Sequence, residues 1–152
     1  MILRNYTEQD LNSLLSLWWD SWHSSASFDH PYPLEVWKSR WENLLLTHQV
    51  AVLETQETII GFAAVNPQTK ELSQIFVSPG RKGEGHGKTL FEWARSICGD
   101  SMMLKTLVDN SEARAFYRSR GMREVGYSVN DFNGKEEIVY SFNKAGENPE
   151  EL

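Results

Sequence analysis

The sequence is poor in cysteine, in long apolar runs and in positive charge. Its one cysteine, Cys98, cannot form an internal disulfide, and a place near the end of an apolar helical stripe is typical of core packing. Residues 1–5 contain no long apolar run that could act as a signal or a membrane span. The formal net charge is −6, whereas nucleic-acid binding requires a basic face. We therefore expect a cytoplasmic protein without nucleic-acid or membrane partners.

The composition is that of an ordinary globular protein, with 40% apolar and 24% charged residues. A length of 152 residues predicts one domain with one continuous core. We place this domain at residues 1–143 and interpret residues 144–152 as a flexible acidic tail. We expect no bound metal.

Hydrophobic periodicity predicts a chain that alternates between strands and helices. Residues 7–10 resemble a capping box, and the apolar residues from Leu11 to Trp22 recur at helical spacing after it. The expected strands are 2–6, 50–54, 59–65, 71–77, 102–108, 124–129 and 137–142. The expected helices are 7–22, 33–45, 87–98 and 110–120. This order predicts the α/β class.

A glycine-rich loop joins the strand ending at Val77 to the helix that begins near Gly87. Glycines at 83, 85 and 87 leave successive backbone N–H groups unobstructed, and a helix N-terminus adds partial positive charge beside them. The loop is therefore predicted to bind a polyanion such as the pyrophosphate of a cofactor.

The spacing of this loop does not fit the common nucleotide motifs. The dinucleotide fingerprint G-x-G-x-x-G fails in both registers, because Lys88 or Leu90 occupies the position of the third glycine. Gly87-Lys88-Thr89 matches the end of a P-loop, but Lys82 stands where the first glycine of that motif is required. A nucleotide-dependent phosphotransferase remains an alternative on this partial match.

Two blocks together carry a family resemblance. Lys82-x-x-Gly85-x-Gly87 after Val77-Ser78-Pro79 resembles the acetyl-CoA signature Q/R-x-x-G-x-G/A, and residues 110–122 resemble the block N-x-x-A-x-x-F-Y-x-x-x-G-F. From about residue 71 to 127 the chain is similar to the GCN5-related N-acetyltransferases (GNAT). The departures are Lys82 for Arg or Gln, which removes a planar fork of donors, and Met122 for Phe. The resemblance implies a mixed, mostly antiparallel central sheet flanked by about four helices.

The resemblance also implies how acetyl-CoA would be held. The pantetheine arm would pair with the backbone of the strand that precedes the loop, and the pyrophosphate would lie on the loop itself. Tyr117 matches the tyrosine that protonates the departing thiolate; a core aromatic beside Phe116 is its other interpretation. The implied cofactor-binding residues are Ile75, Phe76, Val77, Lys82, Gly83, Glu84, Gly85, His86, Gly87, Lys88, Asn110 and Tyr117.

The catalytic base is less well defined. Glu71 matches the catalytic glutamate of the histone-acetylating branch, and it can also be read as a solvated carboxylate at a strand end. His23 and His30 are rival bases, while Lys105 replaces the glutamate used by the ribosomal-protein branch. Aromatic and loop residues are the expected contacts of the acceptor, because ring faces attract cationic amines. They are Trp19, Phe28, His30 and Tyr32.

These observations predict an N-acetyltransferase in which an amine attacks bound acetyl-CoA directly. Cys98 is expected to lie away from the thioester, so no acyl-enzyme through it is expected. The acceptor is a small-molecule or peptide amine of unidentified structure, and the resemblance allows a homodimer. An acyl-CoA sensor without turnover is the competing function outside the enzyme class.

Overall fold

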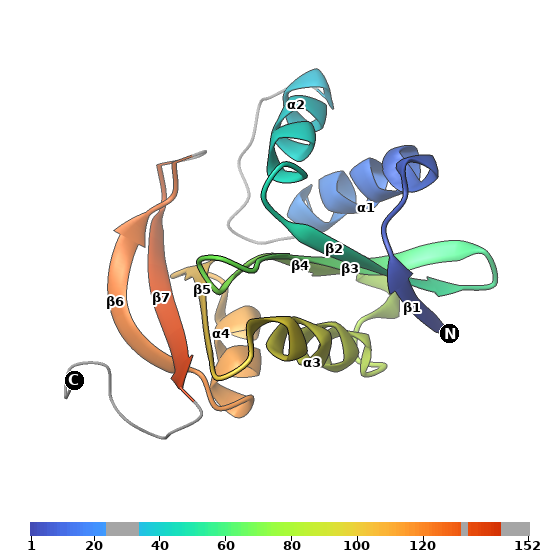
Figure 1. The fold of residues 1–152 in the computed structure, drawn as a ribbon. Coiled ribbons are helices and arrows are strands. Elements are labelled where there is room, and N and C mark those ends of the chain that lie inside the picture. The colour runs from blue at the N-terminus through green and yellow to red at the C-terminus, as the bar shows by residue number, and fades with distance from the viewer. Residues whose placement is uncertain (24–33, 132–133, 144–152) are drawn as a thin grey trace.

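The structure is a computed structural model that describes residues 1–23, 34–131 and 134–143, except the side chains of 21–23 and 34. Its elements follow the predicted order, with two additional 3₁₀ turns, and most predicted bounds are met within two residues (Figure 1). The strands are β1 Ile2–Asn5, β2 Gln49–Thr55, β3 Thr58–Asn66, β4 Glu71–Val77, β5 Ser101–Leu107, β6 Arg123–Val129 and β7 Glu136–Asn143. The helices are α1 Leu11–His23, α2 Leu34–Leu44, α3 His86–Cys98 and α4 Ser111–Ser119, and the 3₁₀ turns are Glu8–Asp10 and Pro79–Arg81.

One seven-stranded sheet runs through the molecule in the order β1-β2-β3-β4-β5-β7-β6. Within the described ranges, β4 and β5 form the one parallel pair, and the other neighbours are antiparallel. The prediction of an α/β domain with a mixed, mostly antiparallel sheet and four helices is confirmed. Among the helices of these ranges, none is both long enough and apolar enough to cross a membrane.

The helices cover both faces of the sheet. Helices α1 and α2 lie over one face, and α3 and α4 lie over the other (Figure 1). The first face holds Trp18, Trp37 and Trp41, each at most 1% exposed and packed edge-to-face with its aromatic neighbours. The second face holds Leu90, Phe91 and other apolar residues of α3. These three tryptophans are therefore core residues, as their periodicity predicts.

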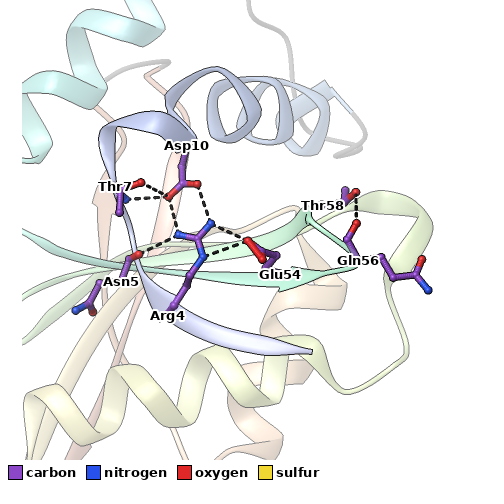
Figure 2. A network of polar contacts seen from close by, with 7 residues as sticks. All are labelled: Arg4, Asn5, Thr7, Asp10, Glu54, Gln56 and Thr58. Atoms are coloured by element: carbon purple, nitrogen blue, oxygen red, sulfur yellow. Dashed lines mark hydrogen bonds and ion pairs between the residues drawn. The ribbon is translucent and has the colours of Figure 1, made fainter.

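A polar network fastens the N-terminal strand to the first helix (Figure 2). Arg4 on β1 donates to both carboxylate oxygens of Asp10 and to Glu54 on β2. The Asp10 carboxylate also accepts from the backbone N–H of Thr7 at 2.8 Å, which is one half of the predicted capping box. The predicted helix start differs in detail, because residues 8–10 form a 3₁₀ turn before α1 begins at Leu11.

Candidate active site

The central feature of the site is the divergence of β4 from β5. β4 pairs with β3 from Glu71 to Val77, but in the described part of the chain it pairs with β5 at one position, Glu71 with Met103. β5 continues instead along β7, and the two halves of the sheet separate (Figure 1). A cleft of about 760 Å³ lies between them and is lined by β4 residues 72–77. An unpaired strand edge of this kind can accept another extended chain.

A β-bulge reorients the side chains of β4 where the strands diverge. Leu72, Ile75 and Val77 all pack on the α3 side of the sheet, although Leu72 and Ile75 are an odd number of residues apart. The ladder explains this, because Leu72 pairs with Val65 and Gln74 with Ala64, which leaves Ser73 as the extra residue. Ser73 and Gln74 both line the cleft.

The glycine loop closes one end of this cleft. Gly83 and Gly85 have φ angles of +85° and +84°, a left-handed conformation that favours glycine, and Gly85 is the N-cap of α3. No side chain of the described residues caps this helix, so the N–H groups of its first turn are available to an anion. Three cationic side chains line the cleft beside the loop: Arg81, Lys82 and Lys88.

Glu84 links two residues of the glycine loop through its carboxylate. Its carboxylate lies 3.1 Å from Nε of Arg81 and 3.0 Å from Nε2 of His86, so it links the two sides of the loop. Glu84 does not itself line the cleft, whereas His86 does and is 8% exposed. Nδ1 of His86 is buried and has no hydrogen-bond partner among the described residues. The loop therefore holds both cations and unsatisfied polar groups.

Helix α4 contributes two predicted residues. Asn110 is its N-cap, and its side-chain oxygen accepts from the N–H of Ala113 at 3.1 Å, which leaves the NH₂ group for another acceptor. Tyr117 lines the cleft and is 7% exposed. Burial, and secondarily Tyr140, raises the pKa of Tyr117 above its usual range. Its hydroxyl is thus protonated at neutral pH and can act as a donor.

The model of the acetyltransferase (GNAT) family matches residues 11–122, which is most of the chain. The chain belongs to the GNAT family. The family makes it an acetyl-CoA-dependent N-acetyltransferase. A comparison with curated proteins found no significant match.

Solved structures share the fold of this GNAT protein at low sequence identity. A GCN5-related N-acetyltransferase from Rhodopseudomonas palustris is 17% identical, with a TM-score of 0.78 over 93% of this chain and 94% of that one. The PaiA N-acetyltransferase from Thermoplasma acidophilum, in complex with coenzyme A, is 20% identical, with a TM-score of 0.73 over 93% and 98%. The protein yncA from Salmonella typhimurium, with its cofactor acetyl-CoA, is 15% identical, with a TM-score of 0.71 over 96% and 95%.

The residues of this GNAT protein fit acetyl-CoA. The unpaired edge of β4 suits the amides of an extended pantetheine arm, and the cationic loop with the uncapped N–H groups at the start of α3 suits a pyrophosphate. Tyr117 lines the same cleft as both. Cys98 lies in the core at 0% exposure, and burial raises the pKa of its thiol, so it is a poor nucleophile.

A smaller polar recess of about 190 Å³ adjoins the cleft and contains Glu71. The recess and the cleft share Ser73 and Gln74 on β4, so the two spaces are adjacent. Glu71 lines the recess and not the cleft that contains Tyr117. The charged residues of the recess are Arg40, Glu71, Lys105, Asp131 and Glu137.

The predicted acceptor residues are not gathered at the cleft in the described part of the chain. Trp19 is half-buried and packs against Trp37 at 5.9 Å between ring centroids, at the edge of the core under α1 and α2. Phe28, His30 and Tyr32 lie outside the described residues, as does the side chain of His23. Sequence reasoning missed Arg40 and Ser73, whose places depend on tertiary packing and on the bulge.

Proposed function

We propose that this GNAT protein transfers the acetyl group of acetyl-CoA directly to a primary amine of a polar small-molecule or peptide acceptor. One observation carries the proposal: the unpaired edge of β4, the cationic glycine loop and Tyr117 all line a single cleft of about 760 Å³. These are the three parts that binding and cleaving a CoA thioester requires. The thioester itself supplies the activated acetyl group.

The loop and the strand would divide the binding between them. Backbone N–H groups from Gly83 to Lys88, with Lys82 and Lys88, would hold the pyrophosphate at the start of α3. The backbone of residues 75–77 would pair with the pantetheine amides as an added strand. Asn110, whose oxygen already caps α4, would donate from its NH₂ group to the same arm.

Tyr117 would serve as the general acid. The departing thiolate needs a proton, and the Tyr117 hydroxyl, whose pKa is raised by burial, is protonated at physiological pH and can donate one. Three aromatic rings surround the Tyr117 ring, those of Phe91, Phe116 and Tyr140. They hold it in one orientation and keep water away.

The polar recess is the place that we assign to the acceptor. Its carboxylates, among them Glu71, favour an ammonium group, and Arg40 and Lys105 favour an anionic group on the same molecule. Ser73 and Gln74 border both spaces, so an amine in the recess would reach an acetyl group in the cleft. Glu71 stays a candidate base on this proposal.

Two measurements test the proposal. Calorimetry of the full chain with CoA should give saturable binding at micromolar ligand, and ATP should not protect the protein against thermal unfolding. Release of free thiol from acetyl-CoA should rise when primary amines are added, with tertiary amines as the control. CoA binding without amine-dependent thiol release would indicate the acyl-CoA sensor. Protection by ATP and not by CoA would indicate the phosphotransferase.

A further inference from the structure

Ser73 is hydrogen-bonded to a histidine that the sequence patterns do not single out. Oγ of Ser73, the extra residue of the β4 bulge, lies 2.7 Å from Nε2 of His48. His48 is half-buried in the turn between α2 and β2, and 25 residues separate the two partners. Ser73 borders the cleft and the polar recess, whereas His48 lines neither of them. The histidine can therefore act on a bound molecule through Ser73.

The other ring nitrogen determines the tautomer of His48. Nδ1 lies 3.1 Å from the carbonyl oxygen of Leu44, which can only accept a hydrogen bond. This contact favours the tautomer in which Nδ1 carries the proton and donates, and Oγ1 of Thr47, 2.8 Å away, can accept from the same N–H. In the neutral ring Nε2 is then unprotonated and accepts from the Ser73 hydroxyl. This is the arrangement of a serine linked to a base whose orientation is fixed by a third group.

The surroundings keep His48 ready to accept a proton. Burial lowers the pKa of His48, and the hydrogen bond to Leu44 opposes this only in part, so the ring is neutral at pH 7. The groups packed directly on the ring, Thr47 and Leu44 at the end of α2 and Ser73 on β4, are uncharged. The charged groups near Ser73 are those of the recess: Arg40, Glu71, Lys105, Asp131 and Glu137.

We propose that Ser73 and His48 form the proton-accepting pair of the acetyl transfer. The inference rests on the proposed function and adds to it the residues that activate the acceptor. Ser73 is the catalytic residue that touches the amine, and His48 acts through it. Glu71, which lines only the recess, then helps to bind the incoming ammonium group.

The proton balance of this step is complete. The ammonium gives one proton to Oγ of Ser73 while the hydroxyl proton passes to Nε2 of His48, which leaves a neutral amine and a protonated imidazole. The amine forms the C–N bond to the acetyl carbon as the C–S bond breaks. The second amine proton goes to the thiolate by way of Tyr117, and His48 returns its proton to water. No oxidant, reductant or further reactant is needed.

The bulge explains why this pair lies where the reaction would occur. Ser73 is the extra residue of the bulge, and it lies beside Gln74 at the border of the cleft and the recess. The amine and the thioester must meet at this border. On this proposal the hydroxyl of Ser73 is next to the reacting nitrogen, while His48 lines neither space.

A matched pair of acceptors tests the proposal. Ethylamine is an ammonium ion at neutral pH and needs a base, whereas trifluoroethylamine is of similar size and is already deprotonated. With ethylamine, His48→Gln should lower kcat about 100-fold, the usual contribution of a general base. The side-chain oxygen of Gln can still accept a hydrogen bond from the Ser73 hydroxyl, so a merely structural role would survive the change. With trifluoroethylamine, kcat should fall less than about threefold, because this amine needs no base.

Control variants distinguish a proton-accepting pair from a hydrogen bond that only supports the fold. Ser73→Ala should match His48→Gln, and the double variant should be no slower, because both residues serve one step. Leu46→Gln, at an 80% exposed position two residues from His48, should leave both rates unchanged. The acid limb of the wild-type pH profile of kcat should disappear in His48→Gln. Equal loss with both amines, or no loss with ethylamine, would overturn the proposal.

Two further readouts do not depend on turnover with these amines. Nitrogen NMR of His48 should show the Nδ1–H tautomer and a titration below the usual histidine pKa of about 6.5; an Nε2–H tautomer would refute the pair. Mass spectrometry after incubation with acetyl-CoA should find Ser73 unmodified. An acetylated Ser73 would indicate an acyl-enzyme and overturn the proton relay. If the wild type binds no CoA, the proposed function fails whatever the tautomer is.

Discussion

The guanidinium of Arg4 and the carboxylate of Asp10 form a bidentate ion pair, with both N···O distances at 2.8 Å. Asp10 is 7% exposed, and the same guanidinium also reaches Glu54 at 2.8 Å (Figure 2). The pair joins β1 to the start of α1, and the Glu54 contact joins both to β2. Planar, charge-assisted contacts of this kind are stronger than ordinary surface ion pairs.

This pair predicts a pH-dependent stability. Hydrogen bonds from Arg4 lower the pKa of Asp10 in the folded protein. The contribution of the ion pair to folding stability is therefore complete above the unfolded pKa of about 3.9 and is lost as the pH falls through the lower folded pKa. Asp10→Asn should cost about 2 kcal/mol at pH 7, a typical value for a charged hydrogen bond. Urea unfolding from pH 7 to 3 should show that the free energy of unfolding falls less in the variant than in the wild type.

The control for this change is Glu8→Gln, at an exposed position in the same 3₁₀ turn. It should change the free energy of unfolding by less than about 0.5 kcal/mol. Parallel pH curves for Asp10→Asn and the wild type would show that the pair does not set the acid stability.

Two glycines of the same loop provide a matched test of the pyrophosphate site. A Cβ added to Gly85 would meet no atom within 4 Å, so the cost of Gly85→Ala comes from its φ of +84° alone. That cost is about 1–2 kcal/mol, and it should appear as a loss of roughly tenfold in CoA affinity as the loop changes shape. Gly80→Ala, also in open space but without a positive φ, should bind CoA as the wild type does. Calorimetry with CoA compares the three proteins.

Tyr117→Phe removes the hydroxyl that we assign to thiolate protonation. The ring packing against Phe91, Phe116 and Tyr140 is retained, so the affinity for acetyl-CoA should change less than twofold. The value of kcat should fall about 100-fold, as expected for the loss of a general acid. Because the pKa of Tyr117 is raised, wild-type kcat should show no basic limb from this group up to its usual value of about 10. Thiol release at saturating acetyl-CoA measures both effects, and an unchanged kcat would remove Tyr117 from the mechanism.

The sequence predicts those features that depend on local pattern. Asn110 caps α4, Gly121 ends it with a φ of +88°, and the strand before the glycine loop is found at 71–77. Each of these is determined by residues within one turn or one strand of one another. The mixed sheet is predicted by the family resemblance that the two blocks carry together. Neither block by itself contains information about strand order.

The sequence does not predict features that depend on long-range register. The bulge at Ser73 exists because β3 and β4 pair out of step there, and no residue type in β4 signals it. His48 meets Ser73 only after α2, β2 and β3 are in place, and it reads along the chain as an ordinary polar residue. Glu71 illustrates the same limit, since a family position does not show that its side chain faces the recess.

Gly61 on β3 lies close against β4, the strand that we assign to the pantetheine arm. It pairs with Val77, and a Cβ there would lie 2.9 Å from the backbone oxygen of Phe76 and 3.0 Å from Cδ1 of Leu90. The Leu90 side chain can rotate away, but the oxygen of Phe76 belongs to β4. Gly61→Ala should therefore push β4 toward the cleft and destabilise the fold by about 1–3 kcal/mol.

The same displacement should weaken CoA binding, because it moves the strand edge that we assign to pantetheine. Gly126→Ala in β6 is the matched control, since a Cβ at this strand glycine meets nothing within 4 Å. It should be neutral or slightly stabilising, as is usual when a strand glycine gains a side chain. Urea unfolding and CoA calorimetry of both variants provide the comparison. If Gly61→Ala destabilises the protein yet binds CoA with unchanged affinity, the pantetheine arm does not lie along β4.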